Sequence, residues 1–401
     1  MSVAGLSRIL FLLVTAAAAQ TTDTAVRELF LKARARVLLN IDKTPRYTCV
    51  ENVVRAQYVL PIRARGASCA ALIRARPQHP LPSDMIWRDR LRVDVAVVDG
   101  NEMFSWAGAG KFETDSMETL VGTGSTGSGD FISFLTSVFG DGPDVIKYLG
   151  LENNAARFDY NVPLEKSHYH YHTRGPEKKI GYGGSFFVDP SDGELQRLIV
   201  ETALFPEGET ACRATDEMTY HTVKIGNGEF LLPEVSTMDV VFQSGSESRN
   251  ETHYSDCKEY VGESTIRYDD VETPASAAVS HAALQPLPPG LKLQIGLSSP
   301  VKGETASAGD AITGLVLRDV KGKDGSVLVH KNDRVRGRIV RLEQVFLPLP
   351  RWTFGVRFDT IERGGVEQPV ALRSDEGGEF HFSGRGGLVL DEKFHSVWQT
   401  R

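Results

Sequence analysis

Three alternating histidines are the most distinctive candidates for chemistry in this sequence. On a β-strand, the stretch His168-Tyr169-His170-Tyr171-His172 would place the histidines on one side and the tyrosines on the other. Histidines two positions apart lie about 6.7 Å apart and can share a zinc ion, but a third ligand would have to come from another strand. We favour a solvated histidine face above inward tyrosines. The alternative is a metal-dependent hydrolase that uses His168 and His170.

A glycine-rich stretch, Gly122-Thr123-Gly124-Ser125-Thr126-Gly127, matches the dinucleotide fingerprint GxGxxG. That fingerprint works only between a buried strand and the N-terminus of a helix. Residues 117–121 make a poor parallel strand, and no βαβ pattern surrounds them, so we expect a flexible loop and no cofactor. The sequence also lacks a GxSxG elbow, a GxxxxGK[ST] phosphate loop and an HExxH pair. We therefore assign no catalytic residue and no metal site, and predict a protein that is not an enzyme.

A basic stripe is the third candidate. Arg334, Arg336 and Arg338 alternate along a predicted strand and would share one face. Such a stripe can hold the phosphate or carboxylate groups of an anionic envelope glycan or lipid. A solvated strand face is the simpler interpretation. Nucleic acid is not an expected partner, because no stacking aromatic residues accompany the arginines.

The N-terminus has the pattern of a secretory signal peptide over residues 1–19. Arg8 precedes the short apolar run Ile9–Val14, and Ala17-Ala18-Ala19 forms a small-residue cleavage site. The run is shorter than the roughly 20 residues that a spanning helix needs. We therefore expect an exported protein of the periplasm or cell envelope that does not span the membrane.

The four cysteines, Cys49, Cys69, Cys212 and Cys257, fit that compartment. An even number of cysteines in an exported chain predicts two structural disulfides, for which three pairings are conceivable. We expect Cys49–Cys69 and Cys212–Cys257, because separations of 20 and 45 residues suit neighbouring strands joined by a loop.

Composition and periodicity predict a mainly β protein. The 401 residues are 41% hydrophobic and 24% charged, close to globular averages, and the formal net charge is −7. An apolar stripe predicts a helix over Thr24–Ile41. Period-two alternation, clearest in Leu91–Val97, then predicts a curved antiparallel sheet that this helix covers. A short helix is expected over Phe131–Phe139, with Asp130 as its N-cap.

The chain divides at a segment rich in alanine, serine and proline. We expect a first domain over residues 20–270, a linker over 271–289 and a second domain over 290–401. The second domain shows short strand patterns throughout, including Arg334–Val345, and predicts a small β-barrel or sandwich. The first domain is acidic and the second slightly basic.

The N-terminal half resembles the lipoprotein-carrier superfamily, the half-barrel of LolA-like and RseB-like proteins. The likeness lies in the leading helix, in Asp89–Val97 with its turn and the return Phe104-Ser105-Trp106, and in Phe186-Phe187-Val188-Asp189-Pro190. Asp89-Arg90-Leu91-Arg92-Val93-Asp94 and the terminal Val397-Trp398-Gln399-Thr400 look like a group of exported acidobacterial proteins. Residues 308–312 and 329–338 are similar to the barrel of TrbI-like secretion-channel subunits.

This resemblance, together with the aromatic strands, implies a function. We expect a non-enzymatic envelope protein whose curved sheet binds an apolar or acyl-bearing ligand such as a lipid, with Phe104, Trp106, Phe158 and Phe186 as candidate contacts. The alternative is an assembly or scaffold module that docks on another envelope protein through its C-terminal barrel.

Overall fold

A computed structural model describes residues 4–60, 66–76, 81, 84–109, 111–172, 176–260 and 285–401, with side chains from residue 24 onward. Most of the expected linker lies outside the described residues. Residues 4–19 of the expected signal peptide lie within the first helix, and cleavage of that peptide stays a prediction. None of the helices in the described part of the chain has the length and apolar character that crossing a bilayer requires.

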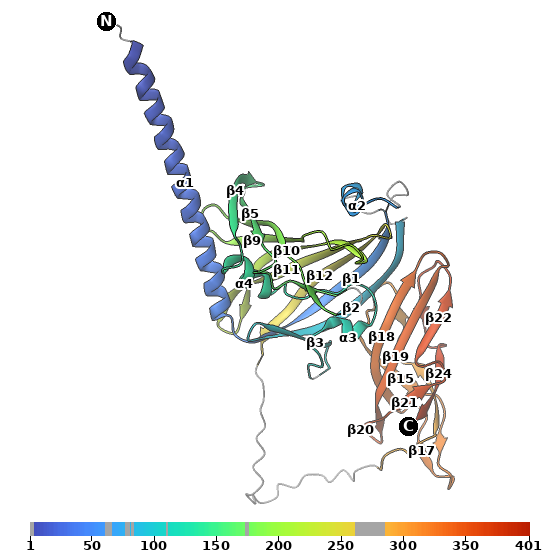
Figure 1. The fold of residues 1–401 in the computed structure, drawn as a ribbon. Coiled ribbons are helices and arrows are strands. Elements are labelled where there is room, and N and C mark those ends of the chain that lie inside the picture. Colours follow the sequence, from blue (N-terminus) through green and yellow to red (C-terminus); the bar gives the residue numbers. More distant parts are fainter. Residues whose placement is uncertain are drawn as a thin grey trace, which may run out of the picture.

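The first helix, α1 (Ala4–Lys43), contains the predicted helix Thr24–Ile41. Its N-terminal part extends away from the rest of the protein, and its C-terminal part lies against the sheet (Figure 1). Ala33 and Val37 are buried there, as their spacing predicts. Pro45 follows the end of the helix, where its ring would disrupt a continued hydrogen-bond ladder.

An N-terminal unit follows, in which a curved antiparallel sheet runs in the order β4-β5-β8-β9-β10-β11-β12-β1-β2-β3. We call the face that carries α3 (Met117–Val121) and α4 (Ser133–Phe139) the inner face (Figure 1). Helix α2 (Cys69–Ala75) packs on the opposite face, where Leu72 contacts Val241. The elements of this unit are β1 (Tyr47–Val59), α2 (Cys69–Ala75), β2 (Met85–Val98), β3 (Asn101–Trp106), α3 (Met117–Val121), α4 (Ser133–Phe139), β4 (Val145–Glu152), β5 (Ala155–Val162), β6 (His170–Tyr171), β7 (Lys178–Lys179), β8 (Tyr182–Val188), β9 (Leu195–Thr202), β10 (Ala211–Ile225), β11 (Gly228–Phe242) and β12 (Ser246–Glu259).

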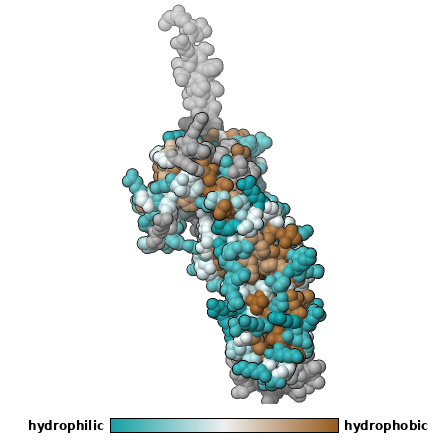
Figure 2. Space-filling model, turned by 90° about the vertical axis from the view of Figure 1, so that its right-hand side faces the viewer, coloured by the Kyte–Doolittle hydropathy of each residue, from teal (hydrophilic) through white to brown (hydrophobic). Residues whose placement is uncertain are grey.

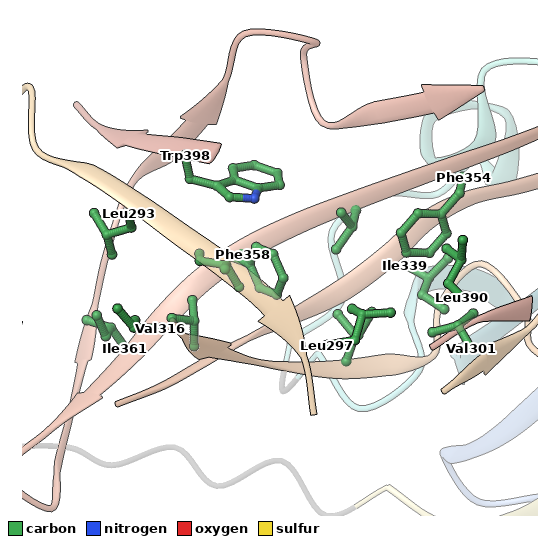
Figure 3. Close-up of a cluster of buried hydrophobic side chains, with 14 of the residues drawn as sticks. Leu293, Leu297, Val301, Val316, Ile339, Phe354, Phe358, Ile361, Leu390 and Trp398 are labelled. Atoms are coloured by element: carbon green, nitrogen blue, oxygen red, sulfur yellow. The ribbon is translucent and has the colours of Figure 1, made fainter. Parts of the chain in front are cut away.

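A C-terminal unit, residues 285–401, wraps its strands around a separate core. Phe354, Phe358 and Trp398 are central to that core (Figure 3). The continuous order is β21-β24-β13-β15-β18-β19-β22. Its strands are β13 (Lys292–Leu297), β14 (Val301–Lys302), β15 (Ala311–Val316), β16 (Val320–Lys321), β17 (Val327–Val329), β18 (Arg334–Val345), β19 (Arg351–Arg363), β20 (Val366–Pro369), β21 (Leu372–Ser374), β22 (Glu379–Ser383), β23 (Val389–Leu390) and β24 (His395–Thr400).

Strand pairing joins the two units into one sheet. Residues 87–89 of β2 pair with residues 343–345 of β18. Arg92 forms an ion pair with Asp310 at 2.7 Å, and the guanidinium of Arg338 donates to the carbonyl oxygens of Ala107 and Gly309. The contact is therefore polar, and backbone hydrogen bonds form part of it.

The predicted fold class is confirmed: the protein is mainly β, with a large antiparallel sheet and few helices. The predicted cap of the short helix is wrong. Ile132 is the N-cap of α4 and no side chain caps it, while Asp130 accepts a hydrogen bond from the Tyr254 hydroxyl at 2.6 Å.

The predicted disulfide pairing is also wrong. Cys49 is bonded to Cys257, and Cys69 is bonded to Cys212. The bonded residues are 208 and 143 positions apart. Sheet pairing brings β1 beside β12, and the second bond fastens α2 to β10. Separation along the chain was therefore a poor guide to distance in space.

Candidate functional site

A cavity of about 1320 Å³ lies over part of the inner face of the curved sheet. Strands β10 to β12 supply its floor. The glycine-rich loop 122–129 and the segment 168–172 supply two sides. Residues of β18 and β19, including Arg341 and Arg351, supply another. Both units of the protein therefore contribute to its wall.

The alternation of β10 directs particular side chains toward this cavity. Ala214, Asp216 and Met218 share one face of the strand and are buried. Asp216 lies between Val200 of β9 and Met238 of β11 in the register of the sheet. Directly opposed residues of paired strands face the same side, so an acidic side chain lies within the inner face.

A polar row continues from Met238 across the inner face. It passes through Asn250 of β12, Arg55 of β1 and Asp89 of β2, and reaches Glu343 of β18. Arg55 is 1% exposed and is bound by Asp89 through two hydrogen bonds of 2.9 and 2.5 Å. Two charges can be buried together when they pair in this bidentate way. Of this row, Met238 and Glu343 line the cavity, whereas Arg55 and Asn250 are bonded to the glycine-rich loop.

An aromatic wall stands beside the polar row. Phe134 of α4, Tyr169 and Tyr182 of β8 all line the cavity. Their ring centroids are 5.7 Å apart for Phe134 and Tyr169, 6.2 Å for Phe134 and Tyr182, and 5.9 Å for Tyr169 and Tyr182. Phe205 and Tyr171 form a second pair at 4.5 Å. The cavity thus has both apolar and charged surface.

Asp216 is the acidic group that faces this wall. Its side chain lines the cavity, is 4% exposed, and accepts a hydrogen bond from the Tyr169 hydroxyl at 3.2 Å. Burial raises the pKa of Asp216 well above its ordinary value, and the carboxylates of Asp130 and Asp239 raise it further. A positive charge nearby would stabilise the ionised form of Asp216.

Three more carboxyl groups lie beneath the root of the glycine-rich loop. Glu102 accepts backbone hydrogen bonds from Gly129 at 2.9 Å and Phe131 at 3.4 Å. Burial, and then the charge of Asp130, raise its pKa to about 7. Burial likewise raises the pKa of Asp130 and, to a greater extent, that of Glu51. Glu102 thus holds the end of the loop, although burial disfavours its ionised form.

The glycine-rich loop has no nucleotide-binding context. Helix α3 ends before Gly122, and along the described chain the next helix begins only at Ser133. The expectation of a loop is confirmed, but the loop is fastened to the sheet. The Arg55 guanidinium donates to the Thr123 carbonyl at 2.6 Å, and the Asn250 amide donates to the Ser125 carbonyl at 2.9 Å.

The histidine stretch has the favoured arrangement. His168, His170 and His172 are exposed, whereas Tyr169 and Tyr171 are half-buried and pack against the core. His172 lies 3.4 Å from the Glu118 carboxylate. Among the residues that the structure describes, no group of three or more histidine, cysteine or acidic side chains is arranged to hold a metal ion.

The four predicted apolar contacts are core residues. Phe158 and Phe186 stack with ring centroids 5.1 Å apart, and Phe30 of α1 lies 6.2 Å from each. Phe104 and Trp106 are buried in a neighbouring cluster. None of the four lines the cavity, because helices of the protein itself and the packed strands cover them. Contact with a ligand at these positions stays a prediction.

The arginine stripe is largely used within the chain. Arg338 holds the C-terminal unit to the N-terminal unit, as described above. Arg336 forms ion pairs with Glu367 and, at 3.5 Å, with Glu362. Arg334 lies 3.9 Å from Glu362. Anion binding by this stripe stays a prediction.

Comparison with known proteins gives little further information. The chain matches no protein-family model and no curated protein. Among solved structures it is similar to a LolA superfamily protein from Nitrosomonas europaea, at 12% identity. The alignment covers 59% of this chain and 94% of that chain, with a TM-score of 0.27. Similarity at this level does not establish a shared fold. The site is therefore interpreted from its own geometry.

Asp216 and the aromatic wall were not identified in the sequence. A signal for Asp216 was present, because in Ala214-Thr215-Asp216-Glu217-Met218 the acid takes an apolar position of the period-two pattern. No comparable signal existed for the wall, since it combines residues from α4, β8 and the segment before β6.

Proposed function

We propose that this protein is an exported, non-enzymatic binding protein whose inner-face cavity takes an amphipathic ligand. The observation that carries this proposal is the cavity itself, with aromatic side chains on one wall and charged ones on others. Each 100 Å² of apolar ligand surface removed from water contributes roughly 2.5 kcal/mol. Two disulfides support export, because such bonds persist in oxidising compartments.

The function as an assembly module has weaker support. Hydrophobic residues gather along the middle of one face of the protein (Figure 2), and Leu349 and Val389 are exposed in the C-terminal unit. However, that unit already uses β18 and Arg338 to bind the N-terminal unit. Ligand binding in the cavity is therefore the function that the geometry favours.

The proposal is tested by placing a charge on the cavity wall. Val240 of β11 is half-buried and lines the cavity, between Ala214 and Ser248 in the register. Val240→Arg should weaken binding of the neutral fluorescent probe N-phenyl-1-naphthylamine at least about tenfold, because the longer side chain fills part of the cavity and burying an apolar probe against a guanidinium is unfavourable. Fluorescence titration of the full chain measures the dissociation constant.

Val54→Arg is the matched control. Val54 is also a strand valine, but it is 39% exposed and outside the cavity. The control should bind the probe as the wild type does, and circular dichroism should show that both variants are folded. Equal affinities of the two variants, or a wild-type protein that does not bind the probe, would contradict the proposed function.

A further inference from the structure

The cavity contains a combination of groups that suits a particular ligand charge. Asp216 on the floor of the cavity faces the wall of Phe134, Tyr169 and Tyr182, and the Tyr169 hydroxyl joins the two parts by its hydrogen bond to Asp216. Asp216 lies in the middle of β10, with Val200 and Met238 on either side. The carboxyl therefore has a fixed position beside the Tyr169 hydroxyl.

Aromatic rings and a carboxylate attract the same kind of partner. The faces of phenylalanine and tyrosine rings carry partial negative charge and attract cations within about 6 Å. A carboxylate in a site of low polarity attracts a cation more strongly than one in water. An organic ammonium group satisfies both, because its carbon substituents pack on the rings while its charge faces the acid.

The rest of the lining agrees with this preference. Asp115, Glu118, Glu177 and Glu343 also line the cavity. Of the two arginines on its wall, Arg341 is already paired with Glu343 at 2.9 Å and Glu379 at 3.2 Å. Arg351 is exposed, as are Asp115, Glu118 and Glu177, so salt and water screen these charges alike. The lining has five carboxyl groups and two guanidinium groups. An anionic headgroup would meet an excess of like charge.

A bound cation would also supply a counter-charge that the described part of the protein does not provide for Asp216. The charges that raise the pKa of Asp216 are the carboxylates of Asp130 and Asp239. Within the described residues, the hydrogen bond from Tyr169 is its one side-chain partner. Burial and these two charges favour the protonated carboxyl, and a cation bound beside Asp216 would favour its ionised form.

We propose that the cavity selects ligands that carry an organic ammonium group, which packs on Phe134, Tyr169 and Tyr182 and faces the Asp216 carboxyl. This inference rests on the proposed function and specifies the chemical class of its ligand. It distinguishes a cationic amphiphile from the fatty acids and neutral lipids that an apolar cavity would otherwise accept.

Three ligands with the same ten-carbon chain test the inference. Decyltrimethylammonium, decanoate and 1-decanol would each displace N-phenyl-1-naphthylamine from the full-length protein at pH 7.5, below their micelle concentrations. We expect the cation to bind at least about tenfold more tightly than decanoate. Asp216→Asn should remove most of this preference while the affinity for decanol changes less than about twofold. The exposed control Asp256→Asn should leave all three affinities unchanged.

A second variant tests the aromatic part without removing the carboxyl. Phe134→Leu keeps an apolar side chain but removes one ring, and it should weaken binding of the cation more than binding of decanol. If decanoate or decanol binds as tightly as the cation, or if Asp216→Asn weakens all three equally, the ammonium preference is wrong and the binding function stands. If none of the three displaces the probe, the proposed function itself is wrong.

Discussion

Buried and half-buried carboxyl groups dominate the chemistry of single residues in this protein. Glu51, Glu102, Asp130 and Asp216 all have raised pKa values, and burial is the largest cause for each. A carboxyl group with a raised pKa holds its proton in the folded state at a pH where the unfolded chain has released it. Folding is then linked to proton uptake, so stability falls as the pH rises through that interval.

Glu102→Gln tests this linkage. The pKa of Glu102 is raised from 4.5 to about 7, so its ionisation should destabilise the folded protein between those values. The variant cannot ionise, and its amide oxygen can still accept from Gly129. At pH 5 the two proteins should have similar free energies of unfolding. At pH 8 the variant should be more stable, by on the order of 1–3 kcal/mol at 1.4 kcal/mol per pKa unit. Urea denaturation at both pH values measures the difference.

Glu229→Gln serves as the control for that comparison, because Glu229 is exposed. It should leave the pH dependence of stability as it is in the wild type. A Glu102→Gln variant with the same pH dependence as Glu229→Gln would show that folding does not raise the pKa of Glu102.

At the scale of elements, the glycine-rich loop is a part of the inner face that the cavity depends on. Gly124 adopts φ +81°, and a Cβ atom added there would lie 2.9 Å from Nη1 of Arg55 and 3.2 Å from the ring of Trp87. Arg55 in turn holds Asp89 and the Thr123 carbonyl. The loop therefore packs closely against the buried ion pair of Arg55 and Asp89.

Gly124→Ala should therefore destabilise the protein more than a strained backbone alone explains. Gly100 gives the matched control, since it has φ +82° and nothing within 4 Å of an added Cβ atom. Gly100→Ala should cost about 1 kcal/mol from the positive φ, and Gly124→Ala at least about 1 kcal/mol more from overpacking. Thermal unfolding of both variants measures this. Equal losses would mean that the loop does not pack on Arg55.

The alternation of apolar and polar residues predicted strands well where one face of the strand contacts solvent and the other is buried. The predicted strand Arg334–Val345 has the bounds of β18, and Leu91–Val97 lies within β2. Alternation encodes such strands locally. It does not encode which strands pair, and the disulfides Cys49–Cys257 and Cys69–Cys212 depend on that long-range pairing.

The candidate site was predicted less well, for the same reason. Phe158 and Phe186 were expected to face a ligand, but Phe30 of α1 and Phe139 of α4 cover them. The open cavity lies instead where β10, β11 and β12 meet the glycine-rich loop. The periodicity of a strand identifies which side chains face the core. It does not identify which helices will pack over them, because that depends on tertiary packing.

At the scale of the whole molecule, the cavity connects the two units. Glu343, Val345 and Arg351 of the C-terminal unit line it together with the N-terminal sheet. The hydrophobic cores of the two units share few residues. One buried residue of the C-terminal unit, Ala308, belongs to a core cluster of the N-terminal unit. We therefore propose two domains, with boundaries near residues 270 and 290, that cooperate at one binding site.

Photolabelling tests this account most directly. A decyltrimethylammonium derivative with a diazirine near the end of its chain would be bound to the full-length protein, irradiated, and located by peptide mass spectrometry. We predict labelled peptides from α4, from Val240–Phe242 of β11 and from Val345–Arg351 of the C-terminal unit, with labelling suppressed by excess unlabelled ligand. Labelling confined to peptides outside the cavity lining, or labelling that excess ligand does not suppress, would contradict the central claim that the inner-face cavity is the binding site.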